Sequence, residues 1–248
     1  MSDTTYSLIA EIAEASTIES VYQIIHKFCQ QHEFDSYIYG ACYPTSLVEP
    51  EFYIITTYPT EWRDRYNDKK YISIDPTVGH CITNITPLIW DHIEPVRKES
   101  PVIDCFMSEA ADFGLRHGIS FPMHCSHNGT AMLSFATKSK NVGSGAHIMR
   151  FMAEGRLFSD YVHEAVLRIV ARQKAETTPS VSLTRREKEC LLWTAEGKTS
   201  LQSSEIMGIT ERTVIYHLIN ASRKLKVQNR QQAVARAVAL GYIQPQFY

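Results

Sequence analysis

The chain has 248 residues, of which 44% are hydrophobic and 21% charged, as expected for a globular protein with a substantial core. No apolar run approaches the roughly 18 residues of a membrane-spanning helix, and the first residues are polar and mildly acidic, unlike a secretory signal. Six cysteines without a CxxC pair are typical of free thiols, so we expect a cytoplasmic protein.

The formal net charge of −2 is unevenly divided along the chain. Residues 180–248 carry 10 Lys and Arg against 5 Asp and Glu, a balance of +5. Subtracting these from the totals of 25 and 27 leaves 15 against 22 for the rest of the chain, a balance of −7. A basic segment joined to an acidic one indicates a polyanionic partner for the C-terminal part alone.

A polar segment from Gln173 to Ser182 divides the chain in two. It contains Pro179 and lacks apolar periodicity, which is typical of a linker. We therefore expect a first domain over residues 1–172, a linker over residues 173–182 and a second domain over residues 183–248.

The first domain mixes strand and helix periods. Strands are predicted over residues 36–43 and 51–58, and on both sides of a hairpin turn at Asn128-Gly129. Helical spacing predicts helices over the following segments: 18–29, 60–70, 76–84, 101–115 and 148–169. Hairpin strands surrounded by helices predict an α+β domain, built as an α/β/α sandwich on an antiparallel sheet.

Three helices are predicted at the start of the second domain, each beginning at a threonine N-cap. The first two caps, Thr184 and Thr199, have a Glu or Gln three residues later, which is the pattern of a capping box. Gly197 suits the position just after the first helix. Thr210 begins a third helix that runs to about Lys226.

The third helix has two distinct faces. Val214, Leu218, Ala221 and Leu225 are separated by 4, 3 and 4 residues and form one apolar stripe. The opposite face and its flanks carry groups that suit base edges and phosphates: Arg212, Thr213, Tyr216, Ile219, Asn220, Arg223 and Lys224. A helix-turn-helix needs such a second helix, although a solvated helix in an ordinary bundle fits the pattern equally well.

The run LTRREKECLLWTAEGKTS…ITERTVIYHLINASRKLKVQNRQQAVARAVALGYI closely resembles the DNA-binding domain of the LuxR/FixJ class over residues 183–243. The resemblance implies an all-α, four-helix domain that contacts DNA through these residues: Lys198, Thr199, Arg212, Thr213, Tyr216, Asn220, Arg223 and Lys224. One departure is Ser203, which stands where the family usually has an inward branched apolar side chain. Loss of that side chain predicts looser packing of the second helix of this domain, which begins at Thr199 and is called the scaffold helix below.

Aromatic residues recur in the first domain close to an acidic one. Tyr58, Trp62 and Tyr66 are spaced by four residues and are predicted to share one helical flank. Aromatics at this spacing more often form a core than a binding site. A buried carboxylate at Asp75 must nevertheless find hydrogen-bond donors, and a ligand amide is one such donor.

The stretch YPTEWRDRYNDKKYISIDPTVGHCITNITPLIW resembles the acyl-homoserine-lactone-binding domain of LuxR-type receptors. The runs DPTVGHC and GLRHGISFPMH are most similar to the LasR subgroup. The resemblance implies a mostly apolar pocket with a few placed polar groups. Its ligand-binding residues would be Tyr58, Trp62, Tyr66, Asp75, Thr77, Trp90 and Ser134.

In this interpretation each polar group of the ligand has a partner. Trp62 would donate to the lactone carbonyl, Asp75 would accept from the amide N–H, and Tyr58 and Ser134 would donate to the acyl carbonyl. Thr77 would add a bond near the amide. The remaining two residues, Tyr66 and Trp90, would pack on the ring and the acyl chain.

The whole chain thus resembles a LuxR-type quorum-sensing regulator that binds an N-acyl-homoserine lactone. We expect a homodimer on palindromic double-stranded DNA, with RNA polymerase as a further partner and with no catalytic residue, metal or cofactor. The segment 124–127, His-Cys-Ser-His, is a weak metal candidate because no second ligand pair has suitable spacing. A lactone hydrolase is the rival from another class, although no GxSxG motif is present. A regulator that responds to a different small molecule, or to none, is the other alternative.

Overall fold

The computed structural model describes residues 3–43, 50–124, 129–139, 145–177 and 182–244. The chain forms two compact units, one built mainly from residues before 175 and the other mainly from residues 175 onward. The first unit is α+β and the second is all-helical, so the predicted fold class is confirmed. Within the described ranges, no helix combines the length and apolar character that crossing a membrane requires.

A five-stranded sheet forms the centre of the first unit, with the strand order β2-β1-β5-β4-β3. Strand β5 pairs antiparallel with both β1 and β4, and β3 pairs antiparallel with β4. The predicted pairing of the first two strands and the later strand pair are confirmed, while Asn128 of the expected turn lies outside the described residues. The strands are β1 (Ser36–Tyr43), β2 (Glu51–Thr56), β3 (Leu88–Ile89), β4 (His117–His124) and β5 (Thr130–Thr137).

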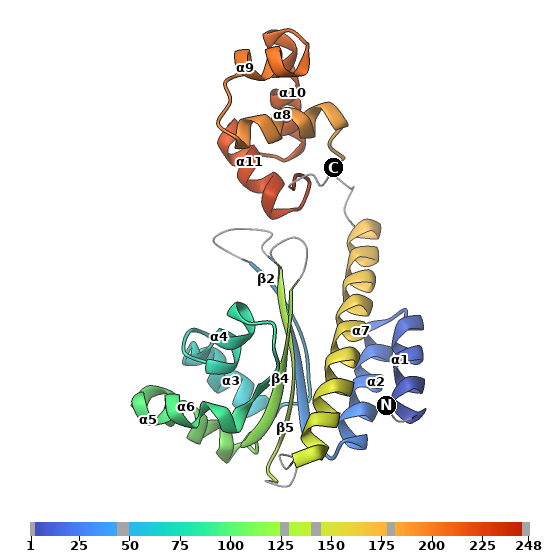
Figure 1. Cartoon of the computed structure of the whole chain (residues 1–248), viewed down its shortest axis with the longest axis vertical. Helices are drawn as coiled ribbons and strands as arrows, with labels where there is room; N and C mark the ends of the chain where they lie inside the picture. The colour runs from blue at the N-terminus through green and yellow to red at the C-terminus, as the bar shows by residue number, and fades with distance from the viewer. Residues whose placement is uncertain (1–2, 44–49, 125–128, 140–144, 178–181, 245–248) are drawn as a thin grey trace. The chain divides into compact units, whose positions relative to one another are not determined.

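Helices cover both faces of this sheet, which makes the α/β/α sandwich that the sequence predicted (Figure 1). One face carries α1 (Asp3–Glu14), α2 (Ile18–Gln31) and α7 (Gly145–Thr177). The other carries α3 (Thr60–Asp68), η1 (Tyr71–Ser73), α4 (Pro76–Thr83), η2 (Trp90–Ile93), α5 (Glu94–Glu99) and α6 (Pro101–Asp112). Helix α7 continues to Thr177, so the first five residues of the expected linker are helical.

Strand alternation directs the large side chains toward α2 and α7. Phe121 of β4 and Phe135 of β5 are fully buried on this face, where both lie against Phe151 of α7. Phe28 of α2 stacks on Phe158 of α7 with ring centroids 3.9 Å apart. The main core of the unit therefore lies between the sheet and these helices.

Gly155 sets how closely α7 approaches the sheet. A Cβ atom at this position would lie 2.5 Å from Cζ of Phe121, which is inside van der Waals contact. Gly79 in α4 is a contrasting helical glycine, because a Cβ atom there would meet nothing within 4 Å.

We predict that Gly155→Ala lowers the free energy of unfolding by roughly 1–3 kcal/mol, because overpacking outweighs the better helix propensity of alanine. Urea denaturation of the full chain measures the change. Gly79→Ala is the matched control and should be neutral or slightly stabilising, since propensity acts there alone. Equal effects of the two substitutions would contradict the close contact of α7 with β4.

The described residues 182–244 of the second unit form four helices: α8 (Arg185–Ala195), α9 (Ser200–Met207), α10 (Glu211–Lys224) and α11 (Arg230–Ala239). The capping boxes at Thr184 and Thr199 are both present, and the Thr210 side chain accepts from the backbone N–H of Thr213. Gly197 has a φ of 77°, as its position after α8 requires. The apolar stripe of α10 is buried in a core that also contains Leu191 of α8.

Candidate ligand-binding and DNA-binding sites

An aromatic cluster lies on the sheet face that α3 and α6 cover. Trp62 of α3 is buried at its centre, with four ring centroids between 5.5 and 6.1 Å away. These rings belong to Tyr66, Tyr71, Phe106 and Phe113. Segments separated by up to about fifty residues thus meet around one tryptophan, as the ligand hypothesis and a plain core would both require.

Tyr58 reaches the same cluster from outside the helix. The prediction that it shares a helical flank with Trp62 and Tyr66 is wrong, because Pro59 is the N-cap of α3 and Tyr58 precedes it. The Tyr58 hydroxyl is buried and has no hydrogen-bond partner among the described residues. Burial raises its pKa well above the ordinary value, so the phenol is a neutral donor. A buried donor without an acceptor is costly unless a ligand supplies one.

Asp75 caps the N-terminus of α4, as its place before Pro76 favours. Its Oδ1 atom accepts from the Thr77 backbone N–H at 2.8 Å, from the Thr77 hydroxyl at 2.7 Å and from the Val78 N–H at 3.4 Å. Its Oδ2 atom accepts from the Tyr66 hydroxyl at 3.0 Å. Burial raises the pKa of Asp75, although the bonds from Thr77, Tyr66 and Val78 oppose the rise.

The two carboxylate oxygens of Asp75 are therefore unequally occupied. Oδ1 has three donors, which hold the side chain in place, while Oδ2 has one donor within the described residues. A carboxylate oxygen accepts more than one hydrogen bond, so Oδ2 keeps capacity for a further donor. Tyr66 and Thr77 thus contact Asp75 directly and orient it.

Trp90 and Ser134 are joined through a serine that the sequence analysis did not select. The Trp90 Nε1–H donates to the Ser120 hydroxyl at 2.9 Å, and the hydroxyls of Ser120 and Ser134 lie 2.8 Å apart. Both serines are fully buried. Ser120 faces Ser134 directly across β4 and β5, so strand alternation placed both on one face and was the available signal.

The sheet face toward α3 and α4 carries small or half-buried side chains, whereas the opposite face carries buried apolar ones. Ile38, Gly40, Cys42 and Met132 are half-buried, whereas the alternate residues of the same strands are buried: Tyr37, Tyr39, Ala41, Ala131 and Leu133. A Cβ atom added at Gly40 would have its nearest neighbour 4.0 Å away. Because side chains alternate along a strand, the half-buried residues all point toward the side of α3 and α4.

Glu109 of α6 ties the outer wall of the cluster together. It accepts from Arg65 Nε at 2.6 Å, Lys69 Nζ at 3.0 Å and the Tyr71 hydroxyl at 2.7 Å. Hydrogen bonds from Arg65, Tyr71 and Lys69 hold the pKa of Glu109 well below its usual range. The contact joins three elements that carry or flank the cluster, and no local motif in the sequence pointed to it.

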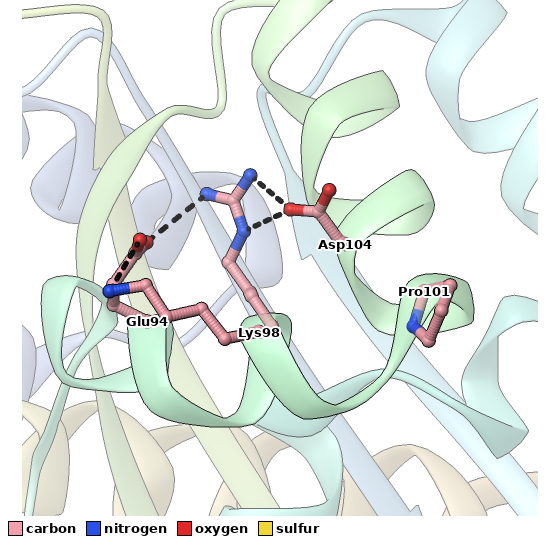
Figure 2. Close-up of a pocket in the computed structure, with 5 residues that line it drawn as sticks. Glu94, Lys98, Pro101 and Asp104 are labelled. Atoms are coloured by element: carbon pink, nitrogen blue, oxygen red, sulfur yellow. Dashed lines mark hydrogen bonds and ion pairs between the residues drawn. The ribbon is translucent and has the colours of Figure 1, made fainter.

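A separate surface pocket of about 390 Å³ lies between α5 and α6 (Figure 2). Arg97 donates from Nε to Asp104 at 2.9 Å and lies 4.0 Å from Glu94, which also pairs with Lys98. None of the predicted ligand residues lines this pocket. The predicted ligand residues lie elsewhere in the unit, so this pocket is not the predicted ligand site.

The candidate DNA-reading face lies on α10. Arg212, Tyr216, Ile219 and Arg223 are exposed, opposite the buried apolar stripe. Tyr216 and Ile219 lie between the two arginines along the helix, and this mixture of apolar and cationic groups suits contact with base edges. The predicted two-faced helix is confirmed.

Other candidate DNA contacts surround this face. Lys198 is exposed just before α9, and Thr199 caps α9 with its side chain. Thr213 shares a hydroxyl hydrogen bond of 2.8 Å with Thr210 at the start of α10. Asn220 accepts from Arg223 at 3.3 Å, which orients the guanidinium along the helix.

Lys224 has a different environment from the other candidates. Its Nζ atom donates to Glu187 Oε2 at 2.8 Å and to the Ser182 carbonyl at 3.0 Å. Glu187 is buried and closes the capping box of α8. Burial alone would raise the pKa of Glu187, but hydrogen bonds from Lys224 and Thr184 outweigh it and hold the pKa below its ordinary value. Lys224 thus joins the end of α10 to the start of α8.

Ser203 points into the second unit, with 1% of its surface exposed. Ser204 beside it is also buried and donates to the Leu201 carbonyl at 2.7 Å. Position 203 is therefore the inward position that the resemblance implied. The looser scaffold helix expected from a serine there stays a prediction.

Two family models match the chain. The autoinducer binding domain matches residues 17–166, and the LuxR family of bacterial regulatory proteins matches residues 181–237. This protein belongs to the LuxR family. It is accordingly a transcriptional regulator with an autoinducer-binding domain and a C-terminal helix-turn-helix, and not an enzyme such as a lactone hydrolase.

Individual relatives align with nearly the whole length of this chain. The transcriptional activator LuxR of Aliivibrio fischeri (strain ATCC 700601 / ES114) is 32% identical over 239 residues, covering 95% of this chain and 93% of the relative. The crystal structure of Escherichia coli SdiA is 27% identical, with a TM-score of 0.80 and 98% of both chains covered. SdiA in complex with octanoyl-rac-glycerol is 26% identical, with a TM-score of 0.80 and coverage of 100% and 99%.

The Lys224–Glu187 pair should stabilise this LuxR-type DNA-binding domain. Lys224→Met keeps the aliphatic stem but leaves the Glu187 carboxylate buried beside an apolar group. We expect a loss of roughly 1–2 kcal/mol in the free energy of unfolding, since the lysine is partly exposed and its pair is partly screened.

Thermal and urea denaturation of the full chain measure this loss. Lys188→Met on α8 is the control and should change stability by no more than about 0.5 kcal/mol. If Lys224→Met and Lys188→Met were equally stable, Lys224 would return to the group of residues available for DNA phosphates.

Proposed function

We propose that this regulator is a quorum-sensing receptor for an N-acyl-homoserine lactone. It would act in the cytoplasm as a homodimer on palindromic double-stranded DNA and would contact RNA polymerase there. The observation that carries the proposal is the buried Tyr58 hydroxyl, which has no acceptor among the described residues although it lies close to Asp75 and Trp62. A ligand carbonyl would satisfy it.

The polar groups of such a ligand match the donors and acceptors of the cluster. Its acyl carbonyl accepts from Tyr58 and Ser134, and its amide N–H donates to Oδ2 of Asp75, the less occupied oxygen. Its lactone carbonyl accepts from the indole N–H of Trp62. A lactone ring placed among these aromatics leaves water and buries its apolar edge.

The acyl chain would follow the half-buried sheet face. Ile38, Gly40 and Met132 lie there and would be covered by the chain. Burial of apolar surface contributes about 25 cal/mol per Å², so this stretch supports affinity without fixing orientation. The polar groups fix the orientation, and the chain adds binding energy.

The runs DPTVGHC and GLRHGISFPMH favour a receptor of the LasR subgroup. The domain boundaries would be residues 1–172 for the autoinducer domain, 173–182 for the linker and 183–248 for the DNA-binding domain, with the start of the linker helical in the structure.

A second candidate ligand is an acylated glycerol. The similar SdiA structure contains octanoyl-rac-glycerol, which also has one acyl carbonyl but lacks the amide. Only the lactone uses Oδ2 of Asp75 as an acceptor for an amide N–H. Mass spectrometry of the compound that co-purifies with the protein decides between the two, and an intact lactone is the expected result.

We predict that Asp75→Asn weakens binding of N-octanoyl-homoserine lactone by roughly 1.5–3 kcal/mol, the range for hydrogen bonds with a charged partner. Asparagine retains the N-cap of α4, so the fold should persist. Isothermal titration calorimetry measures the affinity, with Asp68→Asn on the surface of α3 as the control. Unchanged affinity in a folded Asp75→Asn protein would remove Asp75 from the site.

For DNA, we predict that Arg223→Ala weakens binding to a selected specific duplex by roughly 1–3 kcal/mol more than binding to random duplex. Lys198→Ala should weaken both alike and reduce the salt dependence, as loss of a phosphate contact does. Gel-shift titrations at several salt concentrations separate the two effects. An Arg223→Ala protein with unchanged discrimination would place base reading elsewhere.

A further inference from the structure

Trp90, Ser120 and Ser134 together carry more donor hydrogens than there are hydrogen bonds between them. The indole N–H of Trp90 only donates, and each serine hydroxyl carries one hydrogen. Among the residues that the structure describes, these three hydrogens take part in two hydrogen bonds, Trp90 to Ser120 and Ser120 with Ser134. One hydroxyl hydrogen is therefore left without an acceptor in a fully buried place.

The indole decides which hydroxyl carries this surplus hydrogen. Because Ser120 accepts from Trp90, its oxygen is polarised and its own hydroxyl becomes a better donor. The favoured direction is then Trp90 to Ser120 to Ser134. Ser134 accepts from Ser120, and its hydroxyl hydrogen is available to a further acceptor.

Backbone geometry holds the indole at the start of this series of hydrogen bonds. Trp90 directly follows β3, where Ile89 pairs with Ile119 of β4. A Cβ atom at Gly118 would lie 2.8 Å from Cδ2 of Trp90, so glycine is needed for the ring to lie against the strand. Gly118 and Ser120 are two residues apart and share one face of β4, which brings the indole N–H onto Ser120.

We infer that Trp90 and Ser120 are positioning residues that aim the Ser134 hydroxyl at the acyl carbonyl of the ligand. This inference rests on the proposed function, since it assigns an orientation to one donor of that site. It changes the role of Trp90, which we had expected to pack on the ligand, and it adds Ser120, which touches no ligand atom in this scheme.

The series of hydrogen bonds from Trp90 through Ser120 to Ser134 is called the relay below. A double-mutant cycle tests it with N-octanoyl-homoserine lactone as the probe. Ser120→Ala should weaken binding about 3- to 10-fold when Ser134 is present, the effect of one net hydrogen bond. In a Ser134→Ala background the same substitution should change binding less than about 2-fold. Ser120→Thr keeps the hydroxyl and should restore affinity to within about 2-fold of the wild type.

Infrared spectroscopy gives a readout that a merely structural role would not move. With carbon-13 at the acyl carbonyl of the probe, a strong hydrogen bond lowers the carbonyl stretching frequency. The frequency should rise in both Ser134→Ala and Ser120→Ala and return in Ser120→Thr. If Ser120→Ala does not fold, Trp90→Phe replaces it in the same cycle, because phenylalanine lacks the indole donor.

The possible outcomes distinguish failure of the relay from failure of the proposed function. Additive effects of Ser120→Ala and Ser134→Ala, or an unmoved carbonyl frequency, would overturn the relay while lactone binding stands. If the wild type binds octanoyl-rac-glycerol and not the lactone, the lactone proposal fails and the cycle is measured on the ester carbonyl. Binding of neither compound would overturn both.

Discussion

The alternation of side chains between the two faces of β1, β4 and β5 is the constraint on which the first unit depends. Every second residue of β1, β4 and β5 is apolar and buried on the side of α2 and α7, and most of these side chains are large, whereas the residues between them are small, polar or half-buried. The same period of two thus builds a dense core on one side and leaves room for polar chemistry on the other. A shift of one residue in register would exchange these roles and destroy both.

On the face toward α3 and α4, side chains that stabilise the fold also belong to the proposed ligand site. Asp75 caps α4 through one oxygen and presents the other toward the aromatic cluster, where Tyr66 contacts it. Glu109 joins α6 to α3 and η1 around the same rings. Such shared use fixes side chains before a ligand arrives, which lowers the entropy that binding must overcome.

Much of this architecture could be predicted from the sequence, because its signals are local. Each of these signals spans no more than about a dozen residues, as in the capping boxes at Thr184 and Thr199 and the apolar stripe of α10. Tyr58 was misplaced because its spacing by four from Trp62 was extended across Pro59, beyond the predicted start of the helix at residue 60. Ser120 was missed because its meaning depends on Trp90, thirty residues away, and the Lys224–Glu187 pair spans thirty-seven residues.

The link between Lys224 and Glu187 also bears on how genetic data for this protein should be interpreted. An ion pair joins the first turn of α8 to the last turn of α10, the proposed recognition helix, next to the candidate DNA-reading residue Arg223. A genetic screen for loss of promoter recognition would therefore recover substitutions at Glu187. Glu187 is buried, so such alleles would act through the placement of α10 and not through a contact of their own with DNA.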